Sequence, residues 1–449
     1  MKIIIAGSGE VGFHLAELLS LESLDITLID LNKDKLNHAE NQLDIKVIKG
    51  NSYSYSVLKR ANISNSDLFI AVTGDETINI TSCCIAKKLG SKRTIARITN
   101  IEFIEKKTEM NFEEIGIDEL ISPSALAAEE ILQLLDQSAF SDSHEFEDGE
   151  LTLVGTKLDD TVPFVGKTVK EAASIYSDLH FMPIGIQREG TDYTIIPRGD
   201  TEFESGDQVY FITLKEGVAE ICELTGKIKE SIKNVMILGG GILGFNAAKD
   251  LIDKNIKVKL VEQNKIKALN ISDQLPELMV IHGDGRSVDL LEEENIGSMD
   301  AFISLTQNSE TNIMACLMAK SKNVKKTIAL VENNDYFQLS HSIGIDTIIN
   351  KKLLTANEIF RYIRKGEVVD VTRLNNFNAE ILEFVVKSDS KVNGMIIKDI
   401  ELPRSSIIGG VIKEGKGLIV LGDYKIVEND RVVICCLPRA INKVETLFS

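Results

Sequence analysis

The sequence has no apolar run long enough to cross a membrane and no concentration of basic residues. Its opening apolar run, Ile3 to Ala6, is four residues long, which is too short for a signal peptide, and nothing later approaches the ~18 uninterrupted apolar residues of a membrane span. Asp and Glu number 68 against 50 Lys and Arg, a net charge of −18, and such a chain repels nucleic acid and anionic lipid. We therefore expect no nucleic-acid partner and no direct membrane insertion, so that any membrane role comes through a partner protein.

Cysteine is scarce, and its spacing excludes two common uses. The six cysteines include no C-x-x-C pair, and adjacent cysteines suit neither a zinc site nor a disulfide framework. We expect small buried apolar residues in a reducing cytoplasm, and no metal site. The cysteines are Cys83, Cys84, Cys222, Cys316, Cys435 and Cys436.

What the sequence does have is length and a repeat of itself. Its 449 residues are enough for about three domains of roughly 150 residues each. GSGEVG begins at Gly7 and GGGILG begins at Gly239, an offset of 232 residues, each directly after a short apolar run. The next apolar runs end at Asp30 and Glu262, each 23 residues beyond the first glycine. The landmarks keep an offset of 232 or 233 up to the fifth apolar run, so the chain is a tandem duplication.

The repeat also indicates the fold. In each half, apolar runs of four to six residues alternate with helix-period segments at the spacing of βαβ units. This predicts a parallel sheet with right-handed crossovers that is covered on both faces. The predicted fold class is α/β, a tandem duplication of a Rossmann-like doubly wound parallel-sheet domain, each followed by a small α+β module.

Changes of character along the chain suggest the domain boundaries. An amphipathic helix is expected near residues 122–137 and 350–366, and it would pack on its parent domain or on another subunit. The acidic stretch Asp142 to Gly149 is expected to be a loop between the first domain and its module, and the polar stretch Thr225 to Asn234 to join the halves. The predicted domains are residues 1–140 and 232–366 (Rossmann-like) and residues 141–224 and 367–449 (modules).

The glycine loops carry the functional argument. In G-x-G-x-x-G the first glycine turns the chain out of the strand, the second lets the backbone approach a pyrophosphate, and the third lets helix and strand pack closely. The anion is stabilised by the free N–H groups and the dipole at the helix N-terminus. One match is weak, but two, each after a predicted strand and ahead of a carboxylate, predict nucleotide binding by at least one half. The alternative is a Rossmann scaffold whose glycines serve packing alone.

Side chains around the loops suggest which nucleotide. Asp30 and Glu262 stand where a carboxylate accepts hydrogen bonds from both hydroxyls of an adenosine ribose. They would repel a 2′-phosphate, so NAD(H) is preferred over NADP(H), while ATP or ADP could compete for the same pocket. Arg97 lies in a predicted strand and needs a phosphate or a carboxylate as partner. Because Leu330 replaces it in the second half, the two sites should differ in ligand affinity or identity.

Residues after the third and fourth strands are either ligand contacts or ordinary turn residues. The candidate cofactor-binding residues are Gly7, Ser8, Gly9, Glu10, Val11, Gly12, Asp30, Asn51, Thr73, Gly74, Arg97, Gly239, Gly240, Gly241, Gly244, Glu262, Asp284 and Thr306.

No catalytic constellation accompanies the loops. The six histidines do not recur at equivalent positions in the two halves, and none stands with a carboxylate and an arginine in a recognisable arrangement. A dehydrogenase needs a proton donor or acceptor beside the nicotinamide. The sequence favours binding without chemistry. The alternative is an NAD-dependent oxidoreductase with unrecognised catalytic residues.

Over essentially its whole length the chain resembles the TrkA family of Trk potassium-uptake proteins, which are built from two tandem regulator-of-potassium-conductance (RCK, or KTN) units. The resemblance rests on the two glycine loops, Asp30 and Glu262, the DETIN and SETN turns, the IARI strand and the two small modules. It implies an RCK-N Rossmann domain and an RCK-C module in each half.

The resemblance also implies a function. Family members are cytosolic regulatory subunits, peripheral at the membrane, that bind a potassium transporter subunit of the TrkH/TrkG type. They assemble into rings, here a homotetramer, through the helix after the sixth strand, and nucleotide changes the shape of the ring. For the small modules a cyclic dinucleotide or a cation is left open. The family's ligand contacts fall on Gly7 to Val11, Asp30, Asn51, Thr73, Gly74, Arg97, Gly239 to Gly241, Glu262 and Asp284.

Overall fold

In the computed structural model the chain forms two compact units. One comprises residues 1–127 with 350–363, and the other residues 128–349 with 364–449. In the part of the chain that the structure describes, no helix is long and apolar enough to cross a membrane. All six cysteines are free, and five of them are buried, as expected. The described residues are 1–20, 24–104, 110–136, 139–175, 180–188, 190–191, 193–227, 231–332, 336, 344–363, 368–373 and 377–449.

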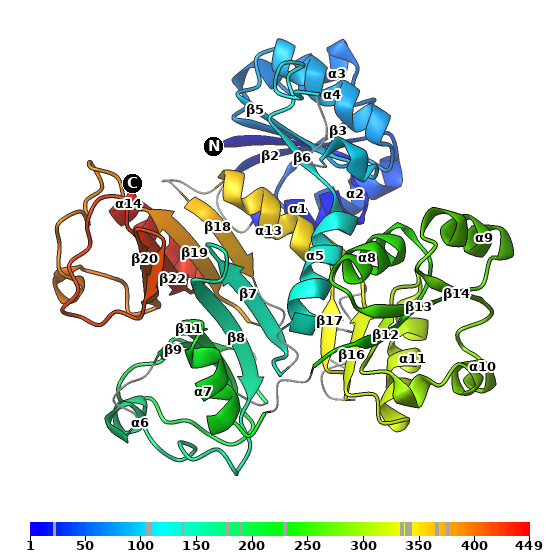
Figure 1. Cartoon of the computed structure of the whole chain (residues 1–449). Helices are drawn as coiled ribbons and strands as arrows, with labels where there is room; N and C mark the ends of the chain where they lie inside the picture. The colour runs from blue at the N-terminus through cyan, green and yellow to red at the C-terminus, as the bar shows by residue number, and fades with distance from the viewer. Residues whose placement is uncertain are drawn as a thin grey trace. The chain divides into compact units, whose positions relative to one another are not determined.

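The first unit is built on a parallel sheet of six strands in the order β3-β2-β1-β4-β5-β6 (Figure 1). This is the doubly wound order in which the first strand lies at the centre and the connections change direction beside it. The Rossmann-type prediction is thereby confirmed for this half. The strands are β1 (Lys2–Ala6), β2 (Asp25–Asp30), β3 (Lys46–Lys49), β4 (Leu68–Ala71), β5 (Arg93–Arg97) and β6 (Glu119–Ile121). The helices are α1 (Glu10–Ser20), α2 (Lys33–Gln42), α3 (Tyr55–Arg60) and α4 (Glu76–Lys88), with 3-10 turns at Ile63–Asn65 and Ile101–Phe103.

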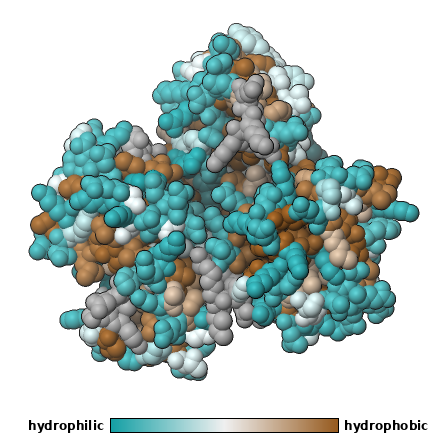
Figure 2. Space-filling model, viewed as in Figure 1, coloured by the Kyte–Doolittle hydropathy of each residue, from teal (hydrophilic) through white to brown (hydrophobic). Residues whose placement is uncertain are grey.

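The second half repeats this sheet within the other unit, in the order β14-β13-β12-β15-β16-β17. The strands are β12 (Asn234–Leu238), β13 (Lys257–Glu262), β14 (Met279–His282), β15 (Ala301–Ser304), β16 (Lys326–Leu330) and β17 (Thr347–Ile349). The helices are α8 (Ile242–Asp253), α9 (Lys265–Gln274), α10 (Val288–Glu293) and α11 (Ser309–Ser321), with a 3-10 turn at Ile296–Ser298. The two halves differ at their surfaces: α9 exposes Ile266 and Leu269, where α2 carries Asp34 and Asn37. Figure 2 shows apolar residues gathered in patches among the hydrophilic ones on the visible face.

Central strands of both sheets are apolar because helices cover both faces. Ile3, Ile4 and Ile5 are completely buried. On one face of the first sheet, Phe69 packs in a cluster with Cys83 of α4. The central strands therefore have apolar residues at successive positions, as the sequence pattern predicted.

The helix after each sixth strand extends toward the opposite half of the chain. Helix α13 (Lys351–Ile363) contacts α1 within the first unit, where Lys352 Nζ lies 3.1 Å from Glu10 Oε2. Helix α5 (Pro123–Asp136) carries Leu132 and Leu135, which line one hollow with Leu251 of α8 in the second unit. The expected partners were the parent domain or another subunit, and the contact of α13 is with neither but with the other half of the same chain.

Each small module is an antiparallel sheet of five strands with short helices, in agreement with the predicted α+β character. The first has the order β10-β9-β11-β8-β7 and the second β18-β19-β22-β20-β21. The first contains β7 (Asp142–Phe146), β8 (Leu151–Lys157), β9 (Phe181–Gln187), β10 (Thr194–Ile195), β11 (Gln208–Thr213), α6 (Val169–Ile175) and α7 (Gly217–Leu224). The second contains β18 (Val368–Arg373), β19 (Glu380–Val385), β20 (Ser406–Lys413), β21 (Lys416–Leu418), β22 (Arg431–Cys436) and α14 (Ile441–Phe448), with 3-10 turns at Ile397–Asp399 and Pro438–Ala440.

One expectation about the modules is wrong. The acidic stretch that begins at Asp142 is not a loop, because residues 142–146 form β7 and pair with β8. Ser143 and Phe146 are buried, so the strand contributes to the core despite its polar sequence. Its residue His144 meets Asp370 of the second module, which lies in the same unit. A tertiary partner therefore explains the polar sequence, which looked loop-like when read alone.

The two modules share one apolar core. The cluster joins Phe146, Tyr210 and Ile212 of the first module to Phe377 and Val433 of the second. The rings of Tyr210 and Phe377 have centroids 4.3 Å apart. Gly185 is required here, because a Cβ atom on it would lie 2.1 Å from the Phe377 ring. The modules are therefore packed together as a pair.

Candidate functional site

The first glycine elbow lies between β1 and α1. Gly7 has φ +108°, a left-handed conformation that favours glycine. A Cβ atom on Gly12 would lie 1.8 Å from the carbonyl oxygen of Gly7, whereas a Cβ atom on Gly9 would meet nothing within 4 Å. The first and third glycines are thus explained by turn and packing, but the second faces open space. Packing alone does not account for Gly9.

The second elbow, between β12 and α8, repeats this arrangement. Gly239 has φ +105°, and a Cβ atom on Gly244 would lie 2.0 Å from the Gly239 oxygen. Gly241, like Gly9, has no neighbour within 4 Å of an added Cβ atom. Both halves therefore leave backbone free at the helix N-terminus, where an anion is stabilised.

A carboxylate is held against each elbow. Asp30, the last residue of β2, accepts hydrogen bonds from the backbone N–H of Ser8 at 2.6 Å and of Asn32 at 2.7 Å. Glu262, the last residue of β13, accepts from Gly240 N at 2.9 Å and from Asn264 N at 2.8 Å. Each carboxylate oxygen has a second lone pair that remains able to accept. The geometry thus places both predicted acids beside the predicted anion site.

Asn79, which is not among the predicted site residues, links the neighbouring strand ends through hydrogen bonds. Asn79 Oδ1 accepts from Thr73 N at 2.9 Å and from Thr73 Oγ1 at 2.7 Å, and its Nδ2 donates to the Arg97 oxygen at 2.8 Å. Asn312 makes the same bonds to Thr306 and to the Leu330 oxygen. The equivalent positions of Asn79 and Asn312 in the repeat were visible in the sequence, but their role as bridges needed the fold.

The loops after the third strands differ between the halves. Asn51 accepts from the backbone N–H of Tyr53 at 3.2 Å. In the second half Arg286 stands in place of Tyr53, and its Nη2 and Nε lie 2.7 and 3.0 Å from oxygens of Asp284. The Arg286 guanidinium lowers the pKa of Asp284. Arg286 is a further candidate site residue that the sequence reading missed, although its exchange with tyrosine in the repeat was the available signal.

The remaining predicted residues fall into three groups. Gly74 borders open space, and Glu10 is exposed beside Lys352. Val11 is buried and so can offer only its backbone, while the buried Ser8 hydroxyl has no hydrogen-bond partner among the residues that the structure describes. Arg97 is half-buried at the end of β5 and has an interaction partner, whereas Leu330 is buried. All of these positions lie at or next to the carboxyl ends of the parallel strands, where ligands of open α/β sheets bind.

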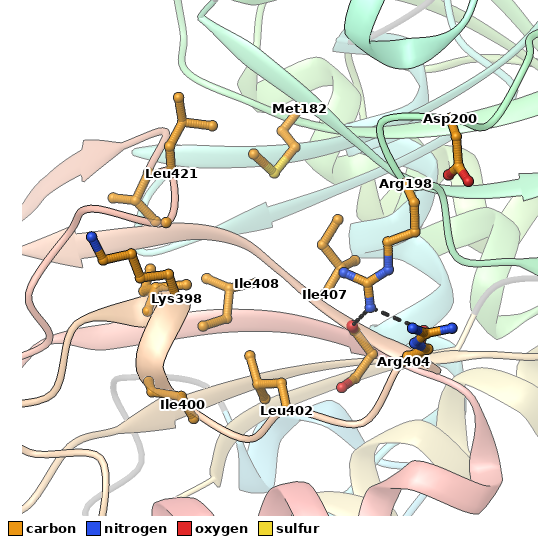
Figure 3. A pocket seen from close by; sticks show the side chains of 14 residues that line it. Met182, Arg198, Asp200, Lys398, Ile400, Leu402, Arg404, Ile407, Ile408 and Leu421 are labelled. Atoms are coloured by element: carbon orange, nitrogen blue, oxygen red, sulfur yellow. Dashed lines mark hydrogen bonds between the residues drawn. The ribbon is translucent and has the colours of Figure 1, made fainter.

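A further hollow, of about 780 Å³, lies between the two modules (Figure 3). Ile408 and Met182 line its apolar wall. Of the described residues that line it, Arg198, Lys398 and Arg404 carry positive charge and Asp200 carries negative charge. Arg198 donates to the carbonyl oxygens of Arg404 at 3.0 Å and Ser406 at 2.8 Å. Burial and the neighbouring Arg404 lower the pKa of Arg198. Among the described residues, no group of three or more His, Cys, Asp or Glu side chains is arranged to hold a metal ion.

The fold and the two elbows define a class of protein: a tandem of doubly wound Rossmann-type domains, each with a glycine elbow backed by a carboxylate and each followed by a small antiparallel module. Family models agree with this class. The TrkA-N domain matches residues 3–123 and 235–351, and the TrkA-C domain matches residues 153–226 and 381–449.

Curated proteins and solved structures are similar over the same extent. The Trk system potassium uptake protein TrkA of Halomonas elongata is 34% identical, with 100% of this chain and 98% of that protein covered. The TrkA of Vibrio alginolyticus is 32% identical with the same coverage. The GsuK RCK domain has a TM-score of 0.61 at 17% identity, covering 100% of this chain and 94% of that one. The GsuK channel bound to NAD has a TM-score of 0.60 at 17% identity, covering 100% and 78%.

At 17% identity the structural likeness supports the fold alone. The matches to the family models and to the curated proteins go further. This chain belongs to the TrkA family of Trk system potassium uptake proteins.

Proposed function

We propose that this protein is the cytoplasmic, nucleotide-binding regulatory subunit of a Trk-type potassium uptake system. One observation carries the proposal: each half pairs an open glycine with a carboxylate that is hydrogen-bonded to the same elbow. That pair is suited to a diphosphate on the backbone and to a ribose on the acid. The TrkA names of the curated relatives supply the potassium system.

NAD(H) is the proposed cofactor, with ATP or ADP as competitors for the same pockets. The acids Asp30 and Glu262 favour a ribose with free hydroxyls over a 2′-phosphate. Among the structural neighbours, the GsuK channel is bound to NAD in one structure and to ADP in another, which supports both classes of ligand. We propose binding without catalysis, since the candidate site residues of both pockets include no histidine. An NAD-dependent oxidoreductase is the alternative.

Replacing both acids tests the pocket assignment. We expect the double variant Asp30→Ala, Glu262→Ala to bind NADH at least tenfold more weakly, because a hydrogen bond to a charged group contributes about 1.5–3 kcal/mol. Isothermal titration of the full chain with NADH, NAD, ATP and ADP measures this. Asp25→Ala is the matched control, since Asp25 is exposed at the opposite end of β2. Unchanged titration curves in the double variant would refute the assignment.

The proposed partner is a membrane potassium transporter subunit of the TrkH/TrkG type, and the proposed assembly is a homotetrameric ring. The contact of α13 with α1 supports it, because this helix already packs outside its own Rossmann domain. We retain the proposed boundaries 1–140, 141–224, 232–366 and 367–449 for the four domains. The alternation of parallel and antiparallel sheets along the chain supports them.

Gating requires that the nucleotide bind one ring conformation better than another. A coupling of about 1–3 kcal/mol gives a 5- to 150-fold bias. The decisive experiment is potassium flux through the reconstituted transporter with this protein, with and without each nucleotide. A nucleotide-dependent flux supports regulation. Potassium flux that is unchanged by every nucleotide, together with NADH consumption in the presence of ketones or quinones, would favour the oxidoreductase instead.

For the hollow between the modules we propose an anionic ligand of the cyclic dinucleotide class rather than a cation. Three cationic side chains and one carboxylate are among the described residues that line it, with apolar walls suited to bases (Figure 3). Thermal unfolding with cyclic dinucleotides of adenine or guanine, compared with potassium chloride at equal ionic strength, distinguishes the two classes. Stabilisation by the salt alone would contradict the proposal.

A further inference from the structure

The edge strands of the two modules meet through charged side chains. Strands β7 and β18 are the outermost strands of their sheets, and both belong to the second unit. His144 Nε2 of β7 and Asp370 Oδ2 of β18 lie 2.5 Å apart, with 23% and 28% of the two side chains exposed. A histidine–carboxylate contact this short across a half-buried interface is strongest when the imidazole is protonated.

A second ion pair crosses the same seam. Arg431 of β22 pairs with Glu147, which follows β7 in the first module. Its Nε also donates to Glu383 Oε1 at 2.7 Å. Glu383 is almost fully buried on β19, where its register partner is Asp370. The seam therefore consists of linked charges, His144 to Asp370 and Arg431 to Glu147, with Glu383 between them.

Further carboxylates face this group from the first module and from α5. Glu130 of α5 and Asp142 of β7 both act electrostatically at this site, and Glu129 neighbours Glu130. Six carboxylates thus face three cations among the described residues: His144, Arg431 and Lys326 of β16, which acts on Asp142. The carboxylates are Glu129, Glu130, Asp142, Glu147, Asp370 and Glu383. Such an excess of acid in a partly desolvated interface favours the uptake of protons.

The direction of each titration follows from this setting. Burial raises the pKa of Glu130 to about 7, with His144 opposing the rise. Burial lowers the pKa of His144, but Asp370, Glu130 and Glu383 outweigh it, so that its pKa lies above the ordinary 6.5. Burial and the neighbouring Asp370 also raise the pKa of Glu383 to about 7, and His144 opposes that rise.

We infer that the seam between β7 and β18 is a proton-dependent clasp that holds these two edge strands together at lower pH and loosens as pH rises. In the closed state His144 is charged against Asp370, and Glu130 beside it is neutral. Loss of these two protons removes the cation from the contact and adds a carboxylate to a site that already has an excess. The shared apolar core remains, so the edge strands separate while the modules stay paired.

The sign is the same for both groups. A group whose pKa is higher in the closed state binds its proton more tightly there, so each proton favours closure. Its contribution is complete below the open-state pKa, near 4.5 for Glu130 and 6.5 for His144, and it is lost as pH rises through the closed-state value. The contribution of Glu130 is therefore lost between about pH 4.5 and pH 7, and that of His144 as pH rises above 6.5, so the clasp opens progressively over this range.

Hydrogen exchange of the full chain tests the clasp. After correction for intrinsic rates, we expect protection of residues 142–146 and 368–373 to fall about tenfold between pH 6 and pH 8.5, the equivalent of one pKa unit. Glu130→Gln, which mimics the protonated acid, should reduce this fall. Asp370→Asn should give low protection already at pH 6.

The control is a second histidine–carboxylate pair in the same module. His180 Nδ1 lies 2.6 Å from Glu220 Oε1, away from the seam, with 42% and 37% of the side chains exposed. His180→Gln should leave the pH dependence of both edge strands unchanged. Equal effects of His180→Gln and His144→Gln would show general destabilisation and overturn the inference.

Direct titration keeps the inference testable if a variant fails to fold. The imidazole resonances of the wild-type chain give the pKa of each histidine, and comparison with His144→Gln, or with the shifts in Glu130→Gln, assigns that of His144. We expect it above 6.5 and lowered by Glu130→Gln. A value at or below 6.5, or protection that stays flat from about pH 6 to pH 8.5, would overturn the clasp.

Discussion

The two glycine pockets share a backbone frame, yet their linings differ in coupled pairs of residues. In the second pocket a Cβ atom on Gly240 would lie 2.5 Å from Ile271 Cδ1. The first pocket has Ser8 in place of this glycine and Ala39 in place of the isoleucine. The smaller residue on the loop is thus paired with a larger residue on the helix, because close-packed interiors conserve volume.

A second exchange follows the same rule. A Cβ atom on Gly285 would lie 2.0 Å from Leu238 Cδ1, where the first half has Ser52 and Ala6. The Ser52 hydroxyl forms a hydrogen bond with the Ser82 hydroxyl at 2.8 Å. In the second half the Leu238 side chain occupies the space beside Gly285. The elbow, the acid and the bridging asparagine are common to both halves. The two halves therefore share the backbone frame of elbow, acid and asparagine, whereas the side chains that line the pockets differ and would determine which ligand each pocket prefers.

Charge is redistributed as well. The first half has Arg97 at the end of β5 and Tyr53 after β3, while the second has Leu330 and Arg286. In the function proposed above, adenosine would lie on the side of the acid-bearing strand, and groups beyond its first phosphates would extend toward β4 and β5. The first pocket therefore suits a longer phosphate chain, and the second a distal group without charge.

The largest effect on stability and nucleotide binding should come from disrupting one glycine elbow while the other is left intact. Gly12→Ala or Gly244→Ala places a Cβ atom within 1.8 or 2.0 Å of a backbone oxygen. We expect a cost at or above the upper end of the about 1–3 kcal/mol of ordinary overpacking, and loss of the affected pocket alone. Calorimetric stoichiometry with NADH and thermal unfolding measure both effects.

Gly9→Ala and Gly241→Ala are the matched controls for that test. Their Cβ atoms meet nothing within 4 Å, so the fold should keep its stability while phosphate approach is blocked. Full NADH stoichiometry in all four variants would contradict the assignment of both pockets.

A smaller effect should come from exchanging one lining pair. Gly240→Ser should destabilise the chain by about 1–3 kcal/mol, because the new side chain meets Ile271. Adding Ile271→Ala recreates the pair of the first pocket, and we expect a coupling of about 0.5–3 kcal/mol in its favour. Urea unfolding of the wild type, both single variants and the double variant measures it. Strict additivity would mean that the two residues do not compensate each other.

The smallest effect should be on ligand choice. Arg97→Leu gives the first pocket the residue of the second, and we expect ATP to bind it about tenfold more weakly while NADH changes little. Competition titrations measure both affinities. Arg93→Leu, at the exposed start of the same strand, is the control. Equal losses for ATP and NADH, or the same loss in the control, would remove Arg97 from the phosphate site.

Much of the fold was predictable because the duplicated landmarks are local. Apolar runs ending at Gly7, Asp30 and Thr73 gave the βα order, and strand ends of a parallel sheet meet at one edge. What escaped prediction depended on distant partners. The stretch from Asp142 forms a strand because it pairs with β8 and contacts the second module through His144. Arg286 became a candidate site residue only through its hydrogen bond to Asp284.

The sequence by itself determined the duplicated halves, the glycine elbows and the acids behind them, since periodicity and spacing act over a few residues. Only the tertiary structure decided which helix covers which domain, how the modules share a core, and that His144 meets Asp370 across 226 residues. Such contacts depend on packing between segments far apart in the chain, and no local pattern encodes their distance.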